Sequence, residues 1–408
     1  MTDPAGIADV VARASYGKLL AFIAARTGDL AEAEDALSDA FAAALSDWPT
    51  HGVPDNPQAW LLTVARRKRV DRARRARTVA QSSPHLRLLA EERGTRTASK
   101  IPDDRLAMMF VCAHPAIDPT VRAPLMLQTV LGLDAATIAS AFLSAPATMG
   151  QRLVRAKARI KLAAIPFRLP ERADLPERLA AVLDAIYAAF SAGWTDPAGT
   201  DLVRRDLALE AIWLCRLIVS LLPDEPEALG LLALMLYAEA RRTARRTAAG
   251  DYVPLDEQAV ATWDAAMIDQ AEAALLRAST LGTVGRYQLE AALQSAHVNR
   301  RQTGRSDWPA ILRFYDALAA VTDSPVVALN RAVVLAETAG AAAGLAELDA
   351  LADDARLATY QPYWAARAGL LARSDRIAEA REAYRRAIGL EADPAVRRFL
   401  AKRLNALE

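Results

Sequence analysis

Cysteine and histidine are scarce in this chain of 408 residues. It has two cysteines, Cys112 and Cys215, and four histidines that lie on separate segments. So few thiols exclude a disulfide framework and a multi-cysteine metal site, and Cys112 with His114 is too small a ligand set for zinc. We therefore expect no metal and no cofactor, and we interpret Cys112 as a buried thiol with a histidine in the following loop.

Segments that would direct the chain to a membrane or out of the cell are also missing. The N-terminal residues MTDPAGIADVVARAS contain no basic segment followed by an apolar one, so no signal peptide is predicted. The longest apolar run, residues 228–238, is too short to span a bilayer and indicates a buried helix. We expect a cytoplasmic protein with no membrane contact.

Motifs of catalysis are absent as well. The sequence contains no glycine-rich phosphate loop, no nucleophile elbow and no cluster of histidine and glutamate residues. These are the patterns by which most hydrolases, kinases and zinc enzymes are recognised in a sequence. We therefore expect that the protein is not an enzyme.

Acidic and basic residues are divided unevenly along the chain, although the net charge is only +1. Residues 1–170 hold 23 Lys and Arg against 16 Asp and Glu, whereas residues 171–408 hold 27 against 33. With 53% apolar and 24% charged residues, the chain is globular rather than disordered. The basic first part and the acidic second part indicate different partners, and a polyanion suits the first.

Helical periodicity predicts an all-α fold. Apolar residues recur three or four positions apart, and no alternating strand pattern or Asn-Gly hairpin is found. Gly28, Pro49 and Gly52 are among the residues that we expect to end helices. Polar or proline-rich breaks at 78–100 and 166–176 divide the chain into blocks. The predicted blocks are 1–77, a linker at 78–100, 101–168, and 177–408.

An acidic helix is predicted over residues 29–47. This segment has an apolar face but no lysine or arginine. Its acidic residues form either a solvated face or a docking surface for a basic partner. They are Asp29, Glu32, Glu34, Asp35, Asp39 and Asp47.

A basic helix is predicted next, over residues 56–77. Asn56 is a suitable N-cap and Pro57 suits the first helical position. Residues 66–77 contain eight cations, which repel one another in water, and phosphates relieve that repulsion while releasing counterions. The abundance of arginine favours nucleic acid over a merely solvated face, and the short apolar side argues against a membrane-surface helix.

A helix-turn-helix pattern ends the second block. Residues 133–143 predict a short helix, Ser144 is the expected N-cap of the next one, and Pro146 lies in its first turn. The second helix, 147–161, carries five cations and no acid. Residues near its start, Gln151 and Arg155 among them, point away from its apolar stripe. Such residues contact base edges when a second helix enters the major groove.

Weak repeats are found in residues 177–408. Tyr315, Ala350 and Tyr384 are spaced 35 and 34 residues apart, and Pro325 and Pro394 each follow a tyrosine by ten positions. In the last unit the spacing is that of a tetratricopeptide repeat, at Trp364, Ala380, Tyr384 and Ala387. Arrays of such repeats leave a concave surface for a peptide or a domain. The alternative is that the aromatic residues are simply core residues. They include Trp213, Tyr237, Trp263 and Trp308.

The order of these parts resembles an extracytoplasmic-function sigma factor of bacterial RNA polymerase. The strings that carry the resemblance are DALSDAF (35–41), NPQAWLL (56–62), IPDDRL (101–106) and ATMGQRLVRAK (147–157). The whole chain resembles a subgroup in which a long tetratricopeptide-like extension follows two sigma domains. In that case 1–77 corresponds to sigma region 2 and 101–168 to sigma region 4.

The resemblance implies a role for each group of charged residues. Loop 48–56 would hold an extruded base of the non-template strand. The residues implied to bind core RNA polymerase are Asp29, Glu34, Asp35 and Asp39. Those implied to meet the −10 element of promoter DNA are Trp60, Arg66, Arg67, Arg69, Arg72, Arg74 and Arg75. Those implied to read the −35 element are Thr148, Gln151, Arg152, Arg155 and Lys157.

Two functions are therefore open. The first is a sigma factor that binds core polymerase and promoter DNA, with an extension that regulates or supports its activity. The second is a helix-turn-helix regulator with a helical-repeat interaction domain, which would need neither the acidic helix nor the first basic helix. The extension itself would contact either a protein partner or, through its acidic balance, the basic sigma domains.

Overall fold

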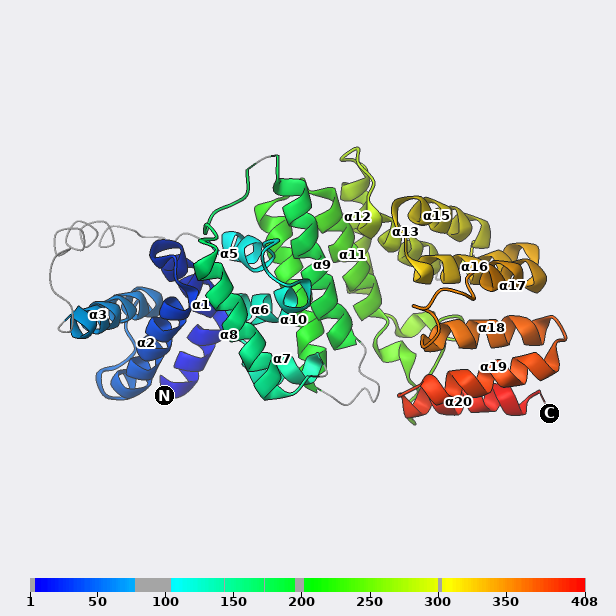
Figure 1. Cartoon of the computed structure of the whole chain (residues 1–408), viewed down its shortest axis with the longest axis horizontal. Coiled ribbons are helices and arrows are strands. Elements are labelled where there is room, and N and C mark those ends of the chain that lie inside the picture. Colours follow the sequence, from blue (N-terminus) through cyan, green and yellow to red (C-terminus); the bar gives the residue numbers. More distant parts are fainter. Residues whose placement is uncertain are drawn as a thin grey trace. The chain divides into compact units, whose positions relative to one another are not determined.

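The structure is a computed structural model that describes residues 4–77, 104–142, 144–171, 173–194, 202–299 and 303–407. Within these ranges it contains 18 α-helices, two short 3-10 helices and no strand (Figure 1). The predicted all-α fold is confirmed. The predicted linker at 78–100 lies outside the described residues. The chain divides into two compact units, Met1–Ala192 and Gly193–Glu408, which are treated separately below.

Unit 1 begins with three helices that pack on one another. Asp29 caps the second helix by accepting a hydrogen bond from the backbone N–H of Glu32 (3.2 Å). The core between the three helices contains Leu37, Ala40 and Trp48, all fully buried. The helices are α1 (Pro4–Thr27), α2 (Leu30–His51) and α3 (Pro57–Arg77).

The expected helix end at Pro49 is wrong, because α2 continues through this proline to His51. A proline in the last turn costs one backbone hydrogen bond, and the buried ring of Trp48 anchors that turn in the core. The helix ends at Gly52, another of the predicted helix ends, whose φ of 85° lies in the region that favours glycine. The predicted base-holding loop is therefore shorter than 48–56 and comprises residues 52–56.

The next helices of unit 1 include the predicted helix-turn-helix. Asp134 accepts hydrogen bonds from the backbone N–H groups of Ala136 and Thr137 (both 2.9 Å) and starts α7, which packs on α8. The last helix begins in unit 1, where the guanidinium of Arg178 donates to the carbonyl oxygen of Phe110 (2.7 Å). The helices are α5 (Arg105–Cys112), α6 (Pro119–Leu131), α7 (Ala135–Ala141), α8 (Pro146–Leu162) and α9 (Leu175–Trp194).

The expected N-cap of α8 is also corrected. Ala145 occupies the cap position and Pro146 is the first helical residue, so Ser144 lies one position too early. No side chain caps this helix; the Ser144 hydroxyl faces the carbonyl oxygen of Ala145 instead (3.5 Å). Proline has no N–H to satisfy at the first helical position, which lessens the need for a capping side chain there.

Unit 2 consists of helices that pack mainly on their neighbours in the sequence (Figure 1). Pro325 and Pro394 each begin a helix. The helices are α10 (Leu202–Leu221), α11 (Pro226–Ala240), α12 (Ala265–Ser279), α13 (Arg286–Val298), α15 (Trp308–Val321), α16 (Pro325–Ala339), α17 (Ala341–Ala350), α18 (Gln361–Arg373), α19 (Ile377–Leu390) and α20 (Pro394–Asn405), with 3-10 turns at Thr243–Arg245 and Val260–Thr262.

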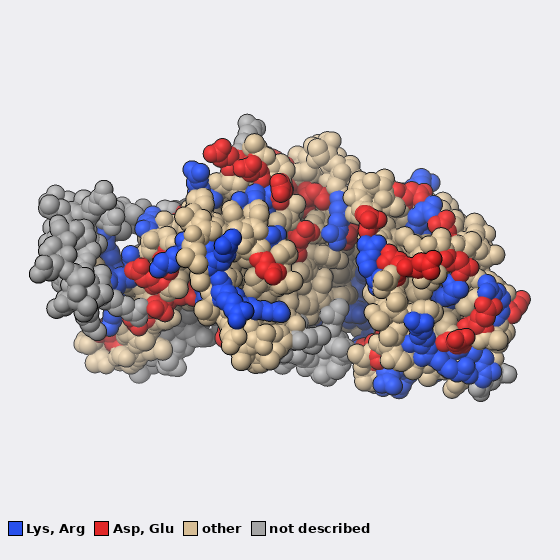
Figure 2. Space-filling view, in the orientation of Figure 1, with Lys and Arg blue, Asp and Glu red and all other residues tan. Residues whose placement is uncertain are grey.

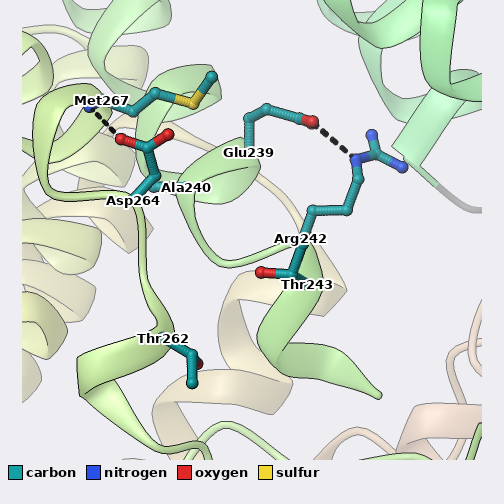
Figure 3. A pocket seen from close by; sticks show the side chains of 7 residues that line it. All are labelled: Glu239, Ala240, Arg242, Thr243, Thr262, Asp264 and Met267. Carbon is teal, nitrogen blue, oxygen red and sulfur yellow. Dashed lines mark hydrogen bonds and ion pairs between the residues drawn. The ribbon is translucent and has the colours of Figure 1, made fainter. Parts of the chain in front are cut away.

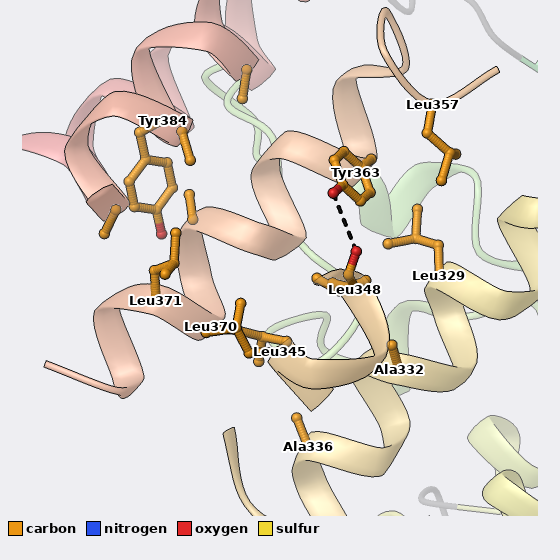
Figure 4. Packing of buried hydrophobic residues seen from close by; sticks show 14 of the residues in the cluster. Leu329, Ala332, Ala336, Leu345, Leu348, Leu357, Tyr363, Leu370, Leu371 and Tyr384 are labelled. Carbon is orange, nitrogen blue, oxygen red and sulfur yellow. Dashed lines mark hydrogen bonds between the residues drawn. The ribbon is translucent and has the colours of Figure 1, made fainter. Parts of the chain in front are cut away.

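An apolar cluster joins helices α16 to α20 (Figure 4). Leu345, Leu348 and Leu370 fill its centre, and the hydroxyl of Tyr363 donates to the carbonyl oxygen of Leu348 (3.3 Å). The repeat residues of the last unit belong to this cluster. Ala380, Tyr384 and Ala387 are buried, and Trp364 is half-buried against them.

The alternative interpretation of the aromatic residues holds for two of the four. Tyr237 and Trp263 are buried, Trp308 is half-buried, and Trp213 is 39% exposed. Burial of Tyr237 is expected because it lies on α11, which is apolar on every side, as its uninterrupted run of apolar residues indicated.

The C-terminal helix α20 is tied to the segment that follows α11. Asp393, immediately before α20, forms an ion pair with Arg246 and accepts a hydrogen bond from the N–H of Ala395 (2.8 Å). The rings of Tyr252 and Phe399 meet edge to face at 5.5 Å. These contacts join residues about 150 positions apart, so the last helix depends on a segment close to the start of unit 2.

Candidate functional site

The cationic helix α3 begins as the sequence predicts. The side chain of Asn56 accepts a hydrogen bond from the N–H of Ala59 (3.0 Å), and Pro57 is the first helical residue. Trp60, in the first turn, is half-buried and packs edge to face against Trp48, with ring centres 5.5 Å apart. This pair holds the start of α3 against the end of α2, next to the short loop 52–56.

The cations of α3 differ in their surroundings. Arg67 and Lys68 are exposed, whereas Arg66 and Arg69 are half-buried. The Nε atom of Arg69 donates to Glu32 of α2 (2.9 Å), so part of its charge is neutralised within unit 1. Three further predicted residues lie on α3, but their side chains are outside the described part of the chain. They are Arg72, Arg74 and Arg75.

The carboxylates of α2 face in two directions. Asp35 is exposed and Asp39 is half-buried, and both lie on the side of α2 away from its core residues. Glu34 and Asp29 instead contact α8: Lys157 Nζ donates to Glu34 Oε2 and Lys161 Nζ donates to Asp29 Oδ2, each over 2.6 Å. The predicted polymerase-binding set is therefore divided between an outer face and a face that meets another helix.

Burial changes the two inward-facing carboxylates differently. Burial raises the pKa of Glu34, and the hydrogen bond and charge of Lys157 offset only part of that rise. Burial also acts to raise the pKa of Asp29, but hydrogen bonds from Lys161 and from the backbone N–H of Glu32 hold that pKa below its usual range. Glu34 is thus the costlier charge to keep in place.

Helix α8 presents the predicted −35 residues to solvent. Thr148, Gln151, Arg152 and Arg155 are exposed. Lys157 is not, because its side chain is only 12% exposed and also donates to Gln128 Oε1 of α6 (3.1 Å). The predicted apolar stripe of α8 is confirmed as buried; it comprises Met149, Leu153, Ala156 and Ile160.

Figure 2 shows Lys and Arg atoms in a band over the position of α8, with few acidic atoms beside it. A cationic strip of this kind on a helix suits a phosphate backbone. Val154 (63% exposed) and Leu162 (81% exposed) interrupt it with apolar side chains.

Sequence reasoning missed the contact between α2 and α8. Lys161 and Gln128 were not predicted to belong to any site, and Lys157 was assigned only to DNA. The opposite charges of the two helices were visible in the sequence. Their pairing was not, because Glu34 and Lys157 are 123 residues apart.

The two cysteines are buried free thiols. Cys112 lies 3.3 Å from the hydroxyl of Thr129, and burial raises its pKa to about 12. His114 follows in a turn, where its Nδ1 accepts a hydrogen bond from the N–H of Ala116 (3.1 Å). The interpretation of Cys112 as a buried thiol beside a loop histidine is confirmed. In the described ranges, no group of three or more His, Cys, Asp and Glu side chains could hold a metal ion.

A small pocket of about 290 Å³ lies in unit 2, between the end of α11 and the start of α12 (Figure 3). Its carboxylates already have partners: Glu239 pairs with Arg242 (2.8 Å), and Asp264 accepts a hydrogen bond from the N–H of Met267 (3.0 Å). These contacts shape the turn after α11 and the start of α12, which is a structural role.

Of the helices that the structure describes, none has the length and apolar character needed to cross a bilayer.

Comparisons with known proteins bear on both units. Residues 11–79 match the sigma-70 region 2 family, and residues 178–279 match a family of unknown function (DUF6596). Over 399 residues the chain is 39% identical to an uncharacterized protein of Rhizobium meliloti (strain 1021), covering 96% of this chain and 93% of that protein. The chain belongs to the same family as this rhizobial protein. No solved structure matches the chain.

The region 2 match identifies the N-terminal domain. It covers α2 and α3, the helices that carry the predicted carboxylates and cations. Sigma-70 region 2 supports the role of a sigma factor, a non-enzymatic initiation factor that binds core RNA polymerase and promoter DNA. The assignment to the extracytoplasmic-function group and the tetratricopeptide character of the extension stay predictions, as do the roles of single residues.

Proposed function

We propose that this chain is an extracytoplasmic-function sigma factor. In this proposal α2 binds core polymerase through its carboxylates, α3 meets the −10 element, and α8 reads the −35 element. Unit 2 is the proposed tetratricopeptide-like extension, which regulates or supports activity. The observation that carries the proposal is the region 2 match over residues 11–79, within which one helix is acidic and the next is cationic.

The proposed mechanism uses two DNA-binding surfaces on one chain. The exposed side chains of α8 would fix the register on the duplex, and Arg67 with its neighbours on α3 would hold the phosphates next to the −10 element. Opening the strands costs a few kcal/mol for each unstacked base. Capture of an extruded base at loop 52–56 would offset that cost. The aromatic residues of this stretch are Trp60 and the buried Trp48, so capture in a pocket should contribute more than stacking.

Run-off transcription tests the proposal. The purified chain is added to core polymerase on genomic fragments, and specific transcripts are expected only when both are present. Co-purification with core polymerase separates the two candidate functions, because a helix-turn-helix regulator would bind DNA without forming a stable complex with the core enzyme. Promoter binding without polymerase binding would therefore favour the regulator.

Arg155→Ala is expected to reduce discrimination at the −35 element. Arg155 is exposed in the middle of α8, on the same helix as Gln151 and Arg152, and its guanidinium can donate to a guanine. Loss of one such contact costs about 1–3 kcal/mol between the correct and the wrong base pair. The measurement is the affinity of the polymerase complex for promoters with single substitutions at −35.

Arg159→Ala is the matched control for this variant. Arg159 is also exposed on α8 but lies one helical turn further from the start of the helix. Its removal is expected to weaken binding to all promoters alike, as loss of a phosphate contact does. If Arg155→Ala also weakened binding to every sequence by the same factor, its role in base recognition would be refuted.

A chain that ends at residue 192 tests the role of the extension. It retains unit 1 as a compact body, including nearly all of α9. If unit 2 regulates or supports activity, the truncated chain will give a different transcript yield for each bound polymerase. Equal yield and equal promoter affinity of both chains would remove such a role.

A further inference from the structure

The connection between α11 and α12 is unusually long for an array of packed helices. It comprises residues 241–264, here called the strap, whereas such connections usually have about 2–8 residues. Helices of unit 2 pack mainly on their neighbours in the sequence, but the strap contacts α20, and its Arg246 pairs with Asp393 across 147 positions. Long loops with a defined position in a compact unit commonly serve binding or regulation.

Both ends of the strap are anchored by buried contacts. Near its start, the ion pair of Arg246 with Asp393 joins side chains that are only 22% and 12% exposed. Near its end, Gln258 is buried and the N–H of Asp264 donates to the carbonyl oxygen of Ala240 (2.9 Å). These contacts hold the two ends of the strap to unit 2.

The middle of the strap, residues 247–257, is held to α20 by exposed ion pairs. Asp251 accepts hydrogen bonds from the Nη2 and Nε atoms of Arg398 (3.1 and 3.2 Å), and both side chains are about half exposed. Glu257 pairs with Arg403 over 2.9 Å, and these side chains are also about half exposed. Exposed ion pairs contribute little to stability. The middle of the strap can therefore leave α20 at low cost while its ends stay in place.

Helix α20 has room for more negative charge than the strap supplies. It carries four cations and no acidic residue; they are Arg397, Arg398, Lys402 and Arg403. Arg397 and Lys402 are exposed, and neither pairs with a carboxylate in the part of the chain that the structure describes. In Figure 2, Lys and Arg atoms gather along the lower edge of unit 2, over the position of α20 in Figure 1. The exposed face of α20 thus suits an acidic ligand.

The strap itself indicates the kind of ligand that fits this face. Its residues 251–257, DYVPLDE, are not helical and combine carboxylates with the ring of Tyr252, which packs on Phe399 of α20. A protein segment with the same chemistry and more carboxylates can make these contacts and also reach Arg397 and Lys402. A long polyanion such as DNA is less suitable, because residues 171–408 carry more acidic than basic residues and would repel it.

We propose that the exposed face of α20 is a docking site for an acidic, non-helical segment of a partner protein, and that the strap occupies this site until the partner binds. The partner segment exchanges with residues 247–257, whereas the anchored ends of the strap stay where they are. The proposal concerns unit 2 alone and goes beyond the function proposed above. Its test uses neither polymerase nor promoter DNA, so failure of either proposal is recognised separately.

Competition between the strap and the partner sets the observed affinity. Because the strap belongs to the same chain, it is present at an effective concentration of roughly millimolar. The apparent dissociation constant of the partner is therefore raised by the reciprocal of the fraction of chains whose strap has left α20. Variants that weaken the strap should bind the partner segment more tightly, and variants that remove the free cations of α20 should bind it more weakly.

A labelled peptide titrated against the full chain tests the proposal. The probe repeats residues 249–259 with Leu255→Glu and Gln258→Glu, which adds two carboxylates to the three already there. Binding is measured by fluorescence anisotropy, and thermal melting followed by circular dichroism shows that each variant remains folded. We expect saturable binding to the unaltered chain, with a dissociation constant below about 1 mM.

Arg397→Glu combined with Lys402→Glu is expected to weaken binding of the probe roughly tenfold or more, because two charge-assisted contacts are replaced by repulsion. Neither side chain holds the strap, so the strap stays in place. The matched control is Arg305→Glu combined with Arg313→Glu, which makes the same change in charge at exposed positions near and on α15. This control should bind the probe like the unaltered chain.

Asp251→Ala combined with Glu257→Ala is expected to tighten binding of the probe about fivefold, because both exposed ion pairs of the strap are lost. The matched control removes two exposed carboxylates elsewhere in unit 2, by Asp353→Ala and Glu382→Ala. It changes the net charge by the same amount and should leave the affinity unchanged.

Hydrogen exchange reports whether the strap moves. In the unliganded chain, the N–H groups of Thr247 and Val253 donate to the carbonyl oxygens of Asp251 (2.9 Å) and Arg245 (2.8 Å). When the probe saturates the chain, amides of residues 247–257 are expected to exchange roughly threefold faster or more, because the strap has left α20. Amides of α20 should not exchange faster.

Four results would overturn the proposal. The variant with the weakened strap does not bind the probe at about 1 mM, or the two charge-reversed pairs lose equal affinity, so that α20 has no special role. A third result is binding of the probe without faster exchange in the strap, which would mean that the strap does not occupy the site. The fourth is an oligonucleotide of equal charge that binds as tightly as the probe and depends equally on Arg397 and Lys402, which would make the face a site for nucleic acid.

Discussion

Replacement of Arg67 and Lys68 by glutamate is expected to reduce promoter affinity of the polymerase complex by about 30-fold or more. Both side chains are exposed on α3, within the region 2 domain. Each phosphate contact contributes a factor of about five at physiological salt, since the logarithm of affinity falls by about 0.9 per contact for each tenfold rise in salt. Two lost contacts give the 30-fold loss, and the introduced negative charges add repulsion.

The salt dependence distinguishes lost contacts from other effects. The slope of log affinity against log salt should become shallower by about 2, one for each contact removed. The measurement is a titration of labelled promoter fragment at several salt concentrations.

A charge-matched control is available in unit 2. Arg397 and Lys402 are exposed on α20, and their replacement by glutamate changes the net charge by the same amount. This control should bind promoter DNA nearly normally. Equal losses in both variants would mean that overall charge, and not the surface of α3, governs binding.

Asp393→Ala is expected to destabilise unit 2 by about 3–5 kcal/mol, the usual cost of removing one partner of a buried ion pair. Asp393 is 9% exposed and pairs with Arg246, whose side chain is 22% exposed. The same carboxylate caps α20, and loss of a cap alone costs about 1 kcal/mol. Without it, Arg246 retains a poorly solvated charge.

Hydrogen exchange locates this effect. Amides of α20 and of the segment 243–262 should exchange at least tenfold faster in Asp393→Ala, because α20 detaches from that segment more often. Asp393→Asn keeps the capping oxygen and should show a smaller change.

Asp251→Ala is the control for Asp393→Ala. Asp251 pairs with Arg398 of α20, but both side chains are about half exposed. Loss of this ion pair should therefore lower the stability of unit 2 by less than about 1 kcal/mol. If amide exchange became faster by a similar factor in both aspartate variants, the buried ion pair would stabilise α20 no more than the exposed one.

Local chemistry predicted most of the helices that form the candidate site. The cap by Asn56, the start at Pro57 and the buried stripe of α8 depend on residues within one or two turns, and each was found as expected. The two errors, Pro49 and Ser144, are also local, and both concern prolines at helix ends. The end of α2 was decided by packing of the turn that holds the buried Trp48, which periodicity does not report. At α8 the cap position is occupied by Ala145, directly before Pro146, and no side chain caps the helix.

The sequence alone predicted the charges of α2, α3 and α8, the apolar stripe of α8 and the region 2 domain that contains α2 and α3. Each of these features depends on residues that are close in sequence. The contact between α2 and α8 was not readable. It requires Gly17 to admit the backbone of α6 and brings together Glu34 and Lys157 across 123 positions. Opposite charges permit many such pairings, and the packing of the helices selects one of them.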